Sequence, residues 1–262
     1  MAYSVFAVPR IYLAVFDMAA TTVDDVISKP GLEEKLPLVI SAYETALEKA
    51  GIRLSFEELN LCRGKDKIEI FREKVAKYRT DLSGEEQQKL AQNLHDNEFV
   101  PALLENVQYL KEMPGTSETF DYLQKRGVYV ATGSGFPSVV TDAINEKLGW
   151  KERGLVNFAT CGERAGGGRP KPNMINQALV EAQLLPKETD LSKKVEGFDY
   201  GIVLKVGDTL EDIHEGNNVG ATTIAVSSGT QGVKMLLQGQ PKVILPSIFA
   251  LPNYLDNHGY FR

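Results

Sequence analysis

The chain has 262 residues, of which 43% are hydrophobic and 24% charged, and this length allows one large domain with a smaller one inserted. A net charge of −6 argues against a general nucleic-acid-binding surface, so any anion site must be local. No apolar run is long enough to cross a bilayer and no signal peptide is recognisable, so we expect a cytoplasmic protein without a membrane partner.

The first predicted element is a buried strand that ends at a carboxylate. Residues 11–16 read IYLAVF and are followed by Asp17, which is how a parallel strand delivers a reactive group to its carboxyl end. Many phosphoryl-transfer enzymes carry a second carboxylate two residues later to protonate the leaving group, but Ala19 holds that place. We expect Thr21 and Thr22 to lie in a tight turn whose backbone amides face a phosphate.

A long helical stretch follows. The periodicity is helical from about residue 36 to residue 106, with Ser55 and Glu58 in a capping-box pattern and a further helix over residues 67–79. This pattern predicts a helical cap of four or five helices at residues 25–106, inserted into a core formed by residues 1–24 and 107–262.

Strands and helices alternate in the rest of the chain. Short β-rich runs occur at residues 127–135, 155–160, 201–208 and 221–229, with helical stretches between them. The alternation predicts an α/β fold with a doubly wound parallel sheet. Ligands of such sheets bind at the carboxyl ends of the strands, where Asp17, Ser134 and Asp208 are expected. Residues 184–201 resemble a polar surface excursion of unassigned role.

Three further motifs suit phosphate and metal binding. Ser134 and Gly135 follow a strand and can offer a hydroxyl and an amide to a phosphate oxygen. Arg169, in the run GGRPKP, is a fixed cation that can neutralise a phosphate. Asp208 and Asp212 are spaced to lie together at a strand end and the turn after it, as hard-oxygen ligands of Mg²⁺ require.

Taken in order, these motifs resemble the haloacid dehalogenase superfamily, and within it the phosphonoacetaldehyde hydrolase (phosphonatase) and phosphonatase-like branch. The superfamily normally opens with DxDx(T/V) and that branch with DxAGT, beside which this chain has Asp17-Met18-Ala19-Ala20-Thr21. Arginine replaces the usual lysine of the third motif in that branch, as Arg169 does here. The likeness covers nearly the whole chain.

The resemblance implies a role for each motif residue. It implies that Asp17 is the nucleophile that forms an aspartyl phosphate, that Ser134 binds the phosphoryl group and that Arg169 stabilises it. Mg²⁺ would be the cofactor, and its ligands by analogy are Asp17, the Ala19 carbonyl, Asp208 and Asp212, the last of these alternatively orienting metal-bound water. A homodimer through cap helices is also implied by analogy.

The same resemblance implies that a lysine takes over the task of the acid that is missing at Ala19. The stretch RGKDKIEIF is close to the branch's GxDK(x)E pattern, which begins here at Gly64, and makes Lys67 the amine of a Schiff base with the substrate. A carbon leaving group needs such an electron sink. An amine free at pH 7 needs a pKa about three units below ~10.4. Burial, the positive end of the helix and the nearby Arg63 and Lys65 are all expected to lower the pKa. The alternative is that Lys67 lies on a solvated, charged helix face.

Two departures from the branch pattern stand out. Ala20 replaces a glycine, so its Cβ would crowd the loop if φ is positive. The histidine that follows the lysine in phosphonatases is absent after Lys67, which puts phosphonoacetaldehyde itself in question more than it does C–P chemistry. Phe136 is a candidate substrate contact, with a place in the core as the alternative.

Three functions therefore compete. The first is a Mg²⁺-dependent hydrolase that cleaves the C–P bond of phosphonoacetaldehyde or a related 2-oxoalkylphosphonate through an aspartyl phosphate and a lysine Schiff base. The second is a phosphatase or phosphomutase of the same superfamily, acting on a small phosphate monoester. The third is a non-catalytic binding module, against which the three aspartates argue.

Overall fold

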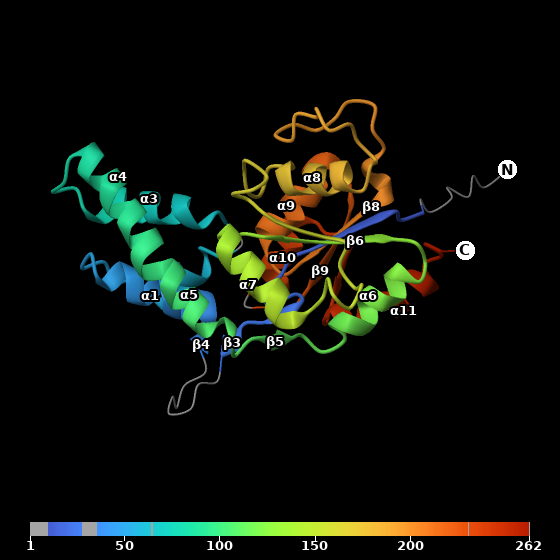
Figure 1. Ribbon diagram of the computed structural model, residues 1–262, viewed down its shortest axis with the longest axis horizontal. Coiled ribbons are helices and arrows are strands. Elements are labelled where there is room, and N and C mark those ends of the chain that lie inside the picture. Colours follow the sequence, from blue (N-terminus) through green and yellow to red (C-terminus); the bar gives the residue numbers. More distant parts are fainter. Residues whose placement is uncertain (1–9, 28–35, 64, 230, 262) are drawn as a thin grey trace.

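A computed structural model describes residues 10–27, 36–63, 65–229 and 231–261 of the chain (Figure 1). Gly64, the first residue of the lysine pattern, lies outside the described residues, as do residues 1–9 of the predicted core. None of the helices in the described ranges has the length and apolarity that crossing a membrane requires.

The core of the structure is a six-stranded sheet in the order β10-β9-β8-β1-β6-β7. Every neighbouring pair of strands is parallel. The strands are β1 (Leu13–Phe16), β6 (Tyr129–Ser134), β7 (Phe158–Cys161), β8 (Val203–Gly207), β9 (Thr222–Val226) and β10 (Val243–Leu245). Because β1 lies inside the sheet and later strands are added on both sides of it, the sheet is doubly wound, which confirms the predicted fold class.

Helices cover both faces of this sheet. The helices are α6 (Thr116–Gln124), α7 (Ser138–Leu148), α8 (Asn173–Glu181), α9 (Leu210–Val219), α10 (Val233–Leu236) and α11 (Leu251–Asn257). In Figure 1, α8 and α9 lie above the sheet and α6 and α11 below it. Leu13 and Val15 of β1 pack in the cluster under α8, whereas Phe16 packs on Phe120 of α6 with ring centroids 5.0 Å apart. The apolar run of β1 is continuous because both of its faces are buried.

A second group of helices lies beside the sheet, at the left of Figure 1, and is called the helical lobe here (residues 38–107). Its elements are α1 (Leu38–Glu48), α2 (Phe56–Asn60), α3 (Lys67–Tyr78), α4 (Gly84–Asn93), a π-helical segment (Leu94–Phe99) and α5 (Val100–Val107). Ser55 caps α2 in the predicted capping box with Glu58, and Ser83 caps α4 in the same way with Glu86. Both caps are local and readable from sequence.

Several short strands escaped the sequence analysis. β2 (Val23–Asp24) pairs with β5 (Lys111–Glu112), and β3 (Val26–Ile27) pairs with β4 (Leu36–Pro37), where the chain passes between sheet and lobe. The helix predicted from residue 36 therefore begins at Leu38. β10 was also missed, and the strand predicted at residues 155–160 is β7, displaced toward the carboxyl end. Two- and three-residue strands carry too little periodicity to predict.

Residues 184–201 form turns that end in a 3₁₀ turn (Tyr200–Ile202). The side-chain amide of Asn176, on α8, donates to the carbonyl oxygens of Leu191 and Lys193 at 3.0 and 2.8 Å. The Tyr200 hydroxyl donates to Asn176 Oδ1 at 2.6 Å. The excursion is thereby fastened to the core away from the carboxyl edge of the sheet.

Candidate active site

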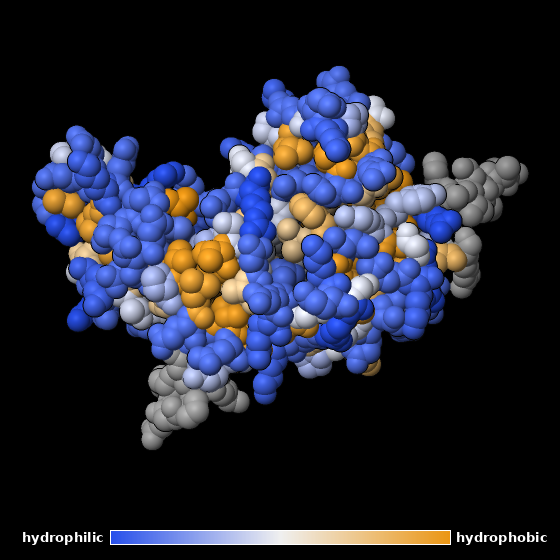
Figure 2. Space-filling view, viewed as in Figure 1, coloured by the Kyte–Doolittle hydropathy of each residue, from blue (hydrophilic) through white to orange (hydrophobic). Residues whose placement is uncertain are grey.

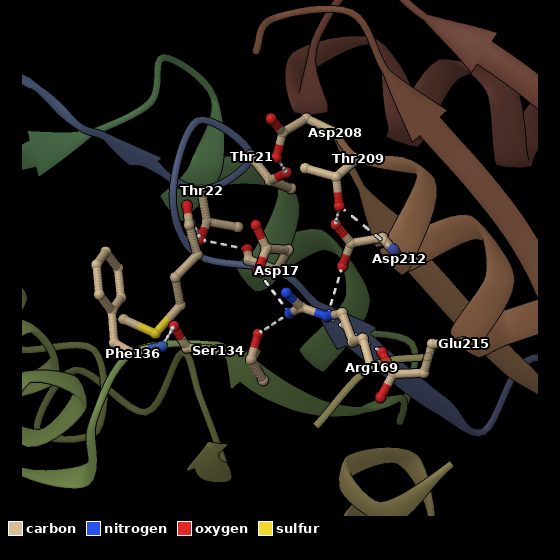
Figure 3. Close-up of polar contacts among 12 residues, drawn as sticks. Asp17, Thr21, Thr22, Ser134, Phe136, Arg169, Asp208, Thr209, Asp212 and Glu215 are labelled. Atoms are coloured by element: carbon tan, nitrogen blue, oxygen red, sulfur yellow. Dashed lines mark hydrogen bonds and ion pairs between the residues drawn. The ribbon is translucent and has the colours of Figure 1, made fainter. Parts of the chain in front are cut away.

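The carboxyl edge of the sheet gathers three buried aspartates. Asp17 follows β1 and Asp208 follows β8, and the two strands end level because Phe16 pairs with Val206. Asp212 lies in the first turn of α9, rather than in a turn directly after the strand as predicted. One carboxylate oxygen from each aspartate lies within 4.8 Å of the others. Figure 3 shows the three side chains converging.

The loop after β1 forms the predicted tight turn. The backbone amides of Thr21 and Thr22 donate to the Met18 carbonyl oxygen at 3.3 and 3.0 Å. The turn itself uses both of these donors, so these two amides are not available to a phosphate. Ala20 adopts φ 60°, the positive value that explains why glycine is usual there.

The two threonine hydroxyls instead hold the aspartates in place. Thr21 Oγ1 donates to Asp208 Oδ1 at 2.9 Å, and Thr22 Oγ1 donates to the Asp17 carbonyl oxygen at 2.8 Å. Both threonines are fully buried. The two threonines therefore hold the aspartates in position, and neither side chain is exposed to contact a substrate.

Arg169 lies at the centre of a buried charge network (Figure 3). Its Nη2 donates to Asp17 Oδ1 at 2.5 Å and to the Gly133 carbonyl oxygen at 2.7 Å. Its Nε lies 2.9 Å from Asp212 Oδ1 and 3.4 Å from Glu215 Oε2. Arg169 thus faces three carboxylates, so it orients the nucleophile candidate Asp17 as well as neutralising it.

Lys205 and Glu215 complete this network and were missed from sequence as members of the site. Lys205 lies in β8, between β1 and β9, and is fully buried. Its Nζ lies 3.0 Å from Asp212 Oδ1 and 2.9 Å from Glu215 Oε2. The sequence did contain a signal for this network, because a lysine inside an apolar strand needs a buried acidic partner, and the next helix offers two acids three residues apart.

Burial and neighbouring charges set the protonation of the three aspartates. Burial, together with repulsion from Asp17, raises the pKa of Asp208 well above its ordinary value. Burial also raises the pKa of Asp17, although Arg169 opposes it. For Asp212, burial is outweighed by Arg169 and Lys205, and its pKa lies below the ordinary value. Clustered carboxylates repel one another, which favours binding of a cation among them.

The aspartate cluster fits a divalent metal ion. Asp208 Oδ2 is buried and has no hydrogen-bond partner among the described residues. A Cβ added to Gly229 would lie 1.9 Å from this oxygen, so the glycine keeps space open beside it. A hard cation suits such an oxygen. Both carboxylate oxygens of Asp212 have partners, Arg169 and Lys205 at Oδ1 and the Thr209 hydroxyl at Oδ2. Arg169 contacts Asp17 through Oδ1, so Asp17 and Asp208 are the better direct ligands.

A lysine from the helical lobe reaches the same cavity as Asp17. Lys67 is the first residue of α3 and is 5% exposed. It lines a small cavity of about 20 Å³ together with Asp17 and nearby site residues, namely Ala19, Val39, Arg63, Ser134, Gly135, Phe136, Arg169 and Thr209. This is room for about one or two water molecules. The alternative of a solvated lysine on a charged helix face is therefore wrong for this closed arrangement.

The surroundings of Lys67 lower its pKa. Its Nζ donates to the Lys65 carbonyl oxygen at 3.1 Å and lies 6.0 and 5.9 Å from the ring centres of Tyr43 and Phe136. Burial is the largest cause, followed by repulsion from Arg169 and Arg63, and together they lower the pKa of Lys67 to about 8. These causes agree with the sequence reasoning, except that Arg169 contributes and the predicted contribution of Lys65 is not among the main causes.

Phe136 is both a core residue and part of the cavity wall. It is 3% exposed and packs in the main apolar cluster, and its backbone amide donates to Ser134 Oγ at 3.0 Å. It also lines a second, larger cavity of about 470 Å³ with Lys67 and Gly135, on the side of the helical lobe. Figure 2 shows apolar surface over α5 and α7. Val100 of α5 and Val139 of α7 line the larger cavity. Phe136 and Lys67 thus line both cavities, and the larger one has a mixed polar and apolar lining.

Comparisons with known proteins agree with this geometry. The chain is 25% identical, over 84% of its length, to a bifunctional phosphonoacetaldehyde hydrolase/aminoethylphosphonate transaminase from Clostridioides difficile, and spans about a third (32%) of that protein. It is 27% identical, over 82% of its length and 76% of the relative, to a phosphonoacetaldehyde hydrolase from Lactiplantibacillus plantarum.

A solved structure and a family model cover the same region. The structure of a phosphonoacetaldehyde hydrolase-like protein from Oleispira antarctica aligns with a TM-score of 0.75 and 19% identity, covering 99% of this chain and 96% of that one. The model of the haloacid dehalogenase-like hydrolases matches residues 32–226. With the parallel sheet and the buried aspartates at its carboxyl edge, this match means that the chain belongs to the haloacid dehalogenase-like hydrolase family.

Proposed function

We propose that this hydrolase cleaves the C–P bond of a 2-oxoalkylphosphonate, phosphonoacetaldehyde or a close relative, in a Mg²⁺-dependent reaction. The observation that carries the proposal is the buried amine of Lys67 in one cavity with the Asp17 carboxylate. The helical lobe, which corresponds to the cap predicted at residues 25–106, would bring the amine to the sheet. The names of the relatives support the same substrate class.

The chemistry requires both groups because carbon is a poor leaving group. The Lys67 amine adds to the substrate carbonyl, takes up a proton and loses water to give a protonated imine. The Asp17 carboxylate attacks phosphorus, the C–P bond breaks, and its electron pair passes into the imine, which becomes an enamine. Water then hydrolyses the aspartyl phosphate, and the enamine takes up a proton and is hydrolysed to the free carbonyl compound and the lysine.

The lowered pKa makes the lysine competent for the first step. With a pKa of about 8, about one Lys67 in ten is a free amine at pH 7. At the ordinary value of 10.5 the share would be about one in three thousand. The closed cavity thus increases the reactive form about three-hundredfold.

The remaining residues divide into metal and phosphoryl ligands. Asp17, Asp208 and the Ala19 carbonyl would hold Mg²⁺, with Asp212 beside them. The bound ion would spread the negative charge of the transferring phosphoryl group. Arg169 holds the Asp17 carboxylate in place, and Ser134 and Gly135 line the cavity where a phosphoryl oxygen would lie.

A phosphate monoesterase or phosphomutase is the competing function for the same fold. Its leaving alkoxide needs a proton donor, and Ala19 has no proton to give at the usual place. Substrate profiling separates the two: we expect turnover of phosphonoacetaldehyde or an oxoalkylphosphonate well above that of a panel of phosphate esters.

Chemical trapping tests the lysine directly. Sodium borohydride added with the oxoalkylphosphonate should leave a reduced adduct on the Lys67 peptide, detected by mass spectrometry. Lys67→Arg should abolish both adduct and turnover, whereas Lys65→Arg, at an exposed neighbouring position, should keep them. Normal turnover by Lys67→Arg would rule out the imine route.

A further inference from the structure

Arg63 is a buried cation of the helical lobe to which the function above gives no task. It lies in the turn after α2, where its amide donates to the Asn60 carbonyl oxygen at 3.1 Å, and is 3% exposed. It lines the small cavity together with Asp17 and Lys67. Its position therefore brings a guanidinium from the lobe to the proposed reaction centre on the sheet.

The guanidinium is only partly satisfied by the protein. Its Nη2 lies 3.1 Å from Asp25 Oδ2, an ion pair in which each side chain is 3% exposed. Neither Nη1 nor Nη2 has a hydrogen-bond partner among the described residues. Buried donors without acceptors are costly. A ligand that brings oxygen acceptors into the cavity would satisfy them.

The other cations of the cavity are committed elsewhere. Arg169 faces Asp17, Asp212 and Glu215 at 2.5, 2.9 and 3.4 Å. Lys67 must be an uncharged amine to form an imine, so it cannot also be the cation that holds the substrate's phosphonate in that step. A dianionic group that enters this cavity therefore finds one arginine with donors to spare.

Electrostatics keep that arginine charged. Burial works against the guanidinium, but Asp25, Asp208 and Asp17 together raise the pKa of Arg63. The last two are the proposed metal ligand and nucleophile, so Arg63 is within electrostatic reach of the position that the phosphorus would occupy. Its planar fork of N–H donors suits two oxygens of one phosphonate.

We propose that Arg63 binds the phosphonyl oxygens of the substrate from the lobe side of the cavity, and that Asp25 compensates its buried charge there. This assignment rests on the proposed function in taking a phosphonate or phosphate as ligand. Because Asp25 follows β2, between the sheet and the lobe, the same contact ties anion binding to the closed arrangement. Carbonyl compounds that lack the phosphonate would lose this contact.

Inorganic phosphate with Mg²⁺ present is the probe, titrated by calorimetry. Arg63→Met alone would leave Asp25 as a buried uncompensated charge, so the informative variant is the double change Arg63→Met with Asp25→Asn. We expect the double variant to bind phosphate about 10- to 100-fold more weakly than wild type, the value of a charge-assisted contact. Asp25→Asn alone, which keeps the arginine, should stay within about threefold.

Two results would overturn the assignment. One is a double variant that binds phosphate like wild type; the other is an equal loss in Asp25→Asn, which would make the pair purely structural. Circular dichroism checks that each variant is folded, and Arg63→Lys, which keeps a cation beside Asp25, replaces Asp25→Asn as the control if the latter is unfolded. The titration needs no C–P cleavage, so a failure of borohydride trapping on Lys67 would leave this test standing.

Discussion

Replacing Lys67 by methionine should remove activity and stabilise the protein. Methionine keeps the length and flexibility of the side chain without the amine. Lowering the lysine pKa from 10.5 to about 8 means that the fold disfavours the protonated form. At about 1.4 kcal/mol for each pKa unit, the charged lysine costs the folded state about 3 kcal/mol. The variant should be more stable by about that amount at neutral pH.

The stability gain should depend on pH with a definite sign. Below pH 8 the lysine is protonated in both states, so the whole cost is present. Between about 8 and 10.5 the folded protein binds fewer protons than the unfolded chain, so wild type gains stability as the pH rises. Above pH 10.5 the lysine is neutral in both the folded and the unfolded state, so this electrostatic cost of wild type relative to Lys67→Met should vanish.

Urea unfolding at pH 7 and at pH 10, followed by circular dichroism, measures both quantities. Lys65→Met is the matched control, because Lys65 is exposed two residues away, and it should change the free energy of unfolding by less than about 0.5 kcal/mol. A Lys67→Met variant that is less stable than wild type at pH 7, or whose gain is equal at both pH values, would refute the reasoning.

Two further changes probe the metal cluster and the cavity wall. Gly229→Ala places a Cβ 1.9 Å from Asp208 Oδ2, so Mg²⁺ affinity measured by calorimetry should fall at least about tenfold, whereas Gly232→Ala, with open space at its Cβ, should not change it. Phe136→Ala removes a ring that lies 5.9 Å from the Lys67 amine, so more water from the larger cavity, which Lys67 also lines, should surround the amine and the pH profile of borohydride trapping should move to higher pH. An unchanged profile would mean that the ring does not limit hydration of the amine.

Local and periodic features of this protein were readable from its sequence. The continuous apolar run before Asp17 predicted a strand buried on both faces, and the capping box at Ser55 predicted a helix start. Because parallel strands end at one edge, small and acidic residues after separate strands could be placed together before any coordinates. That rule brought Asp17, Ser134 and Asp208 to one site.

Other features depended on contacts that no local pattern encodes. The turn after β1 uses the amides of Thr21 and Thr22 for itself, a competition between donors that depends on the exact backbone path. The two-residue strands between sheet and lobe are too short to show a period.

The ionisable residues show most clearly what the sequence determines and what the tertiary structure adds. The sequence determined which ionisable residues the chain contains and on which elements they lie. Only the tertiary structure decided that Lys67 is buried, that Lys205 faces Glu215 and that Arg63 reaches Asp25, because the energy of a charge is set by burial and by partners distant in the chain. The residue types therefore determine which reactive groups this site contains, and the packing determines their protonation and their partners.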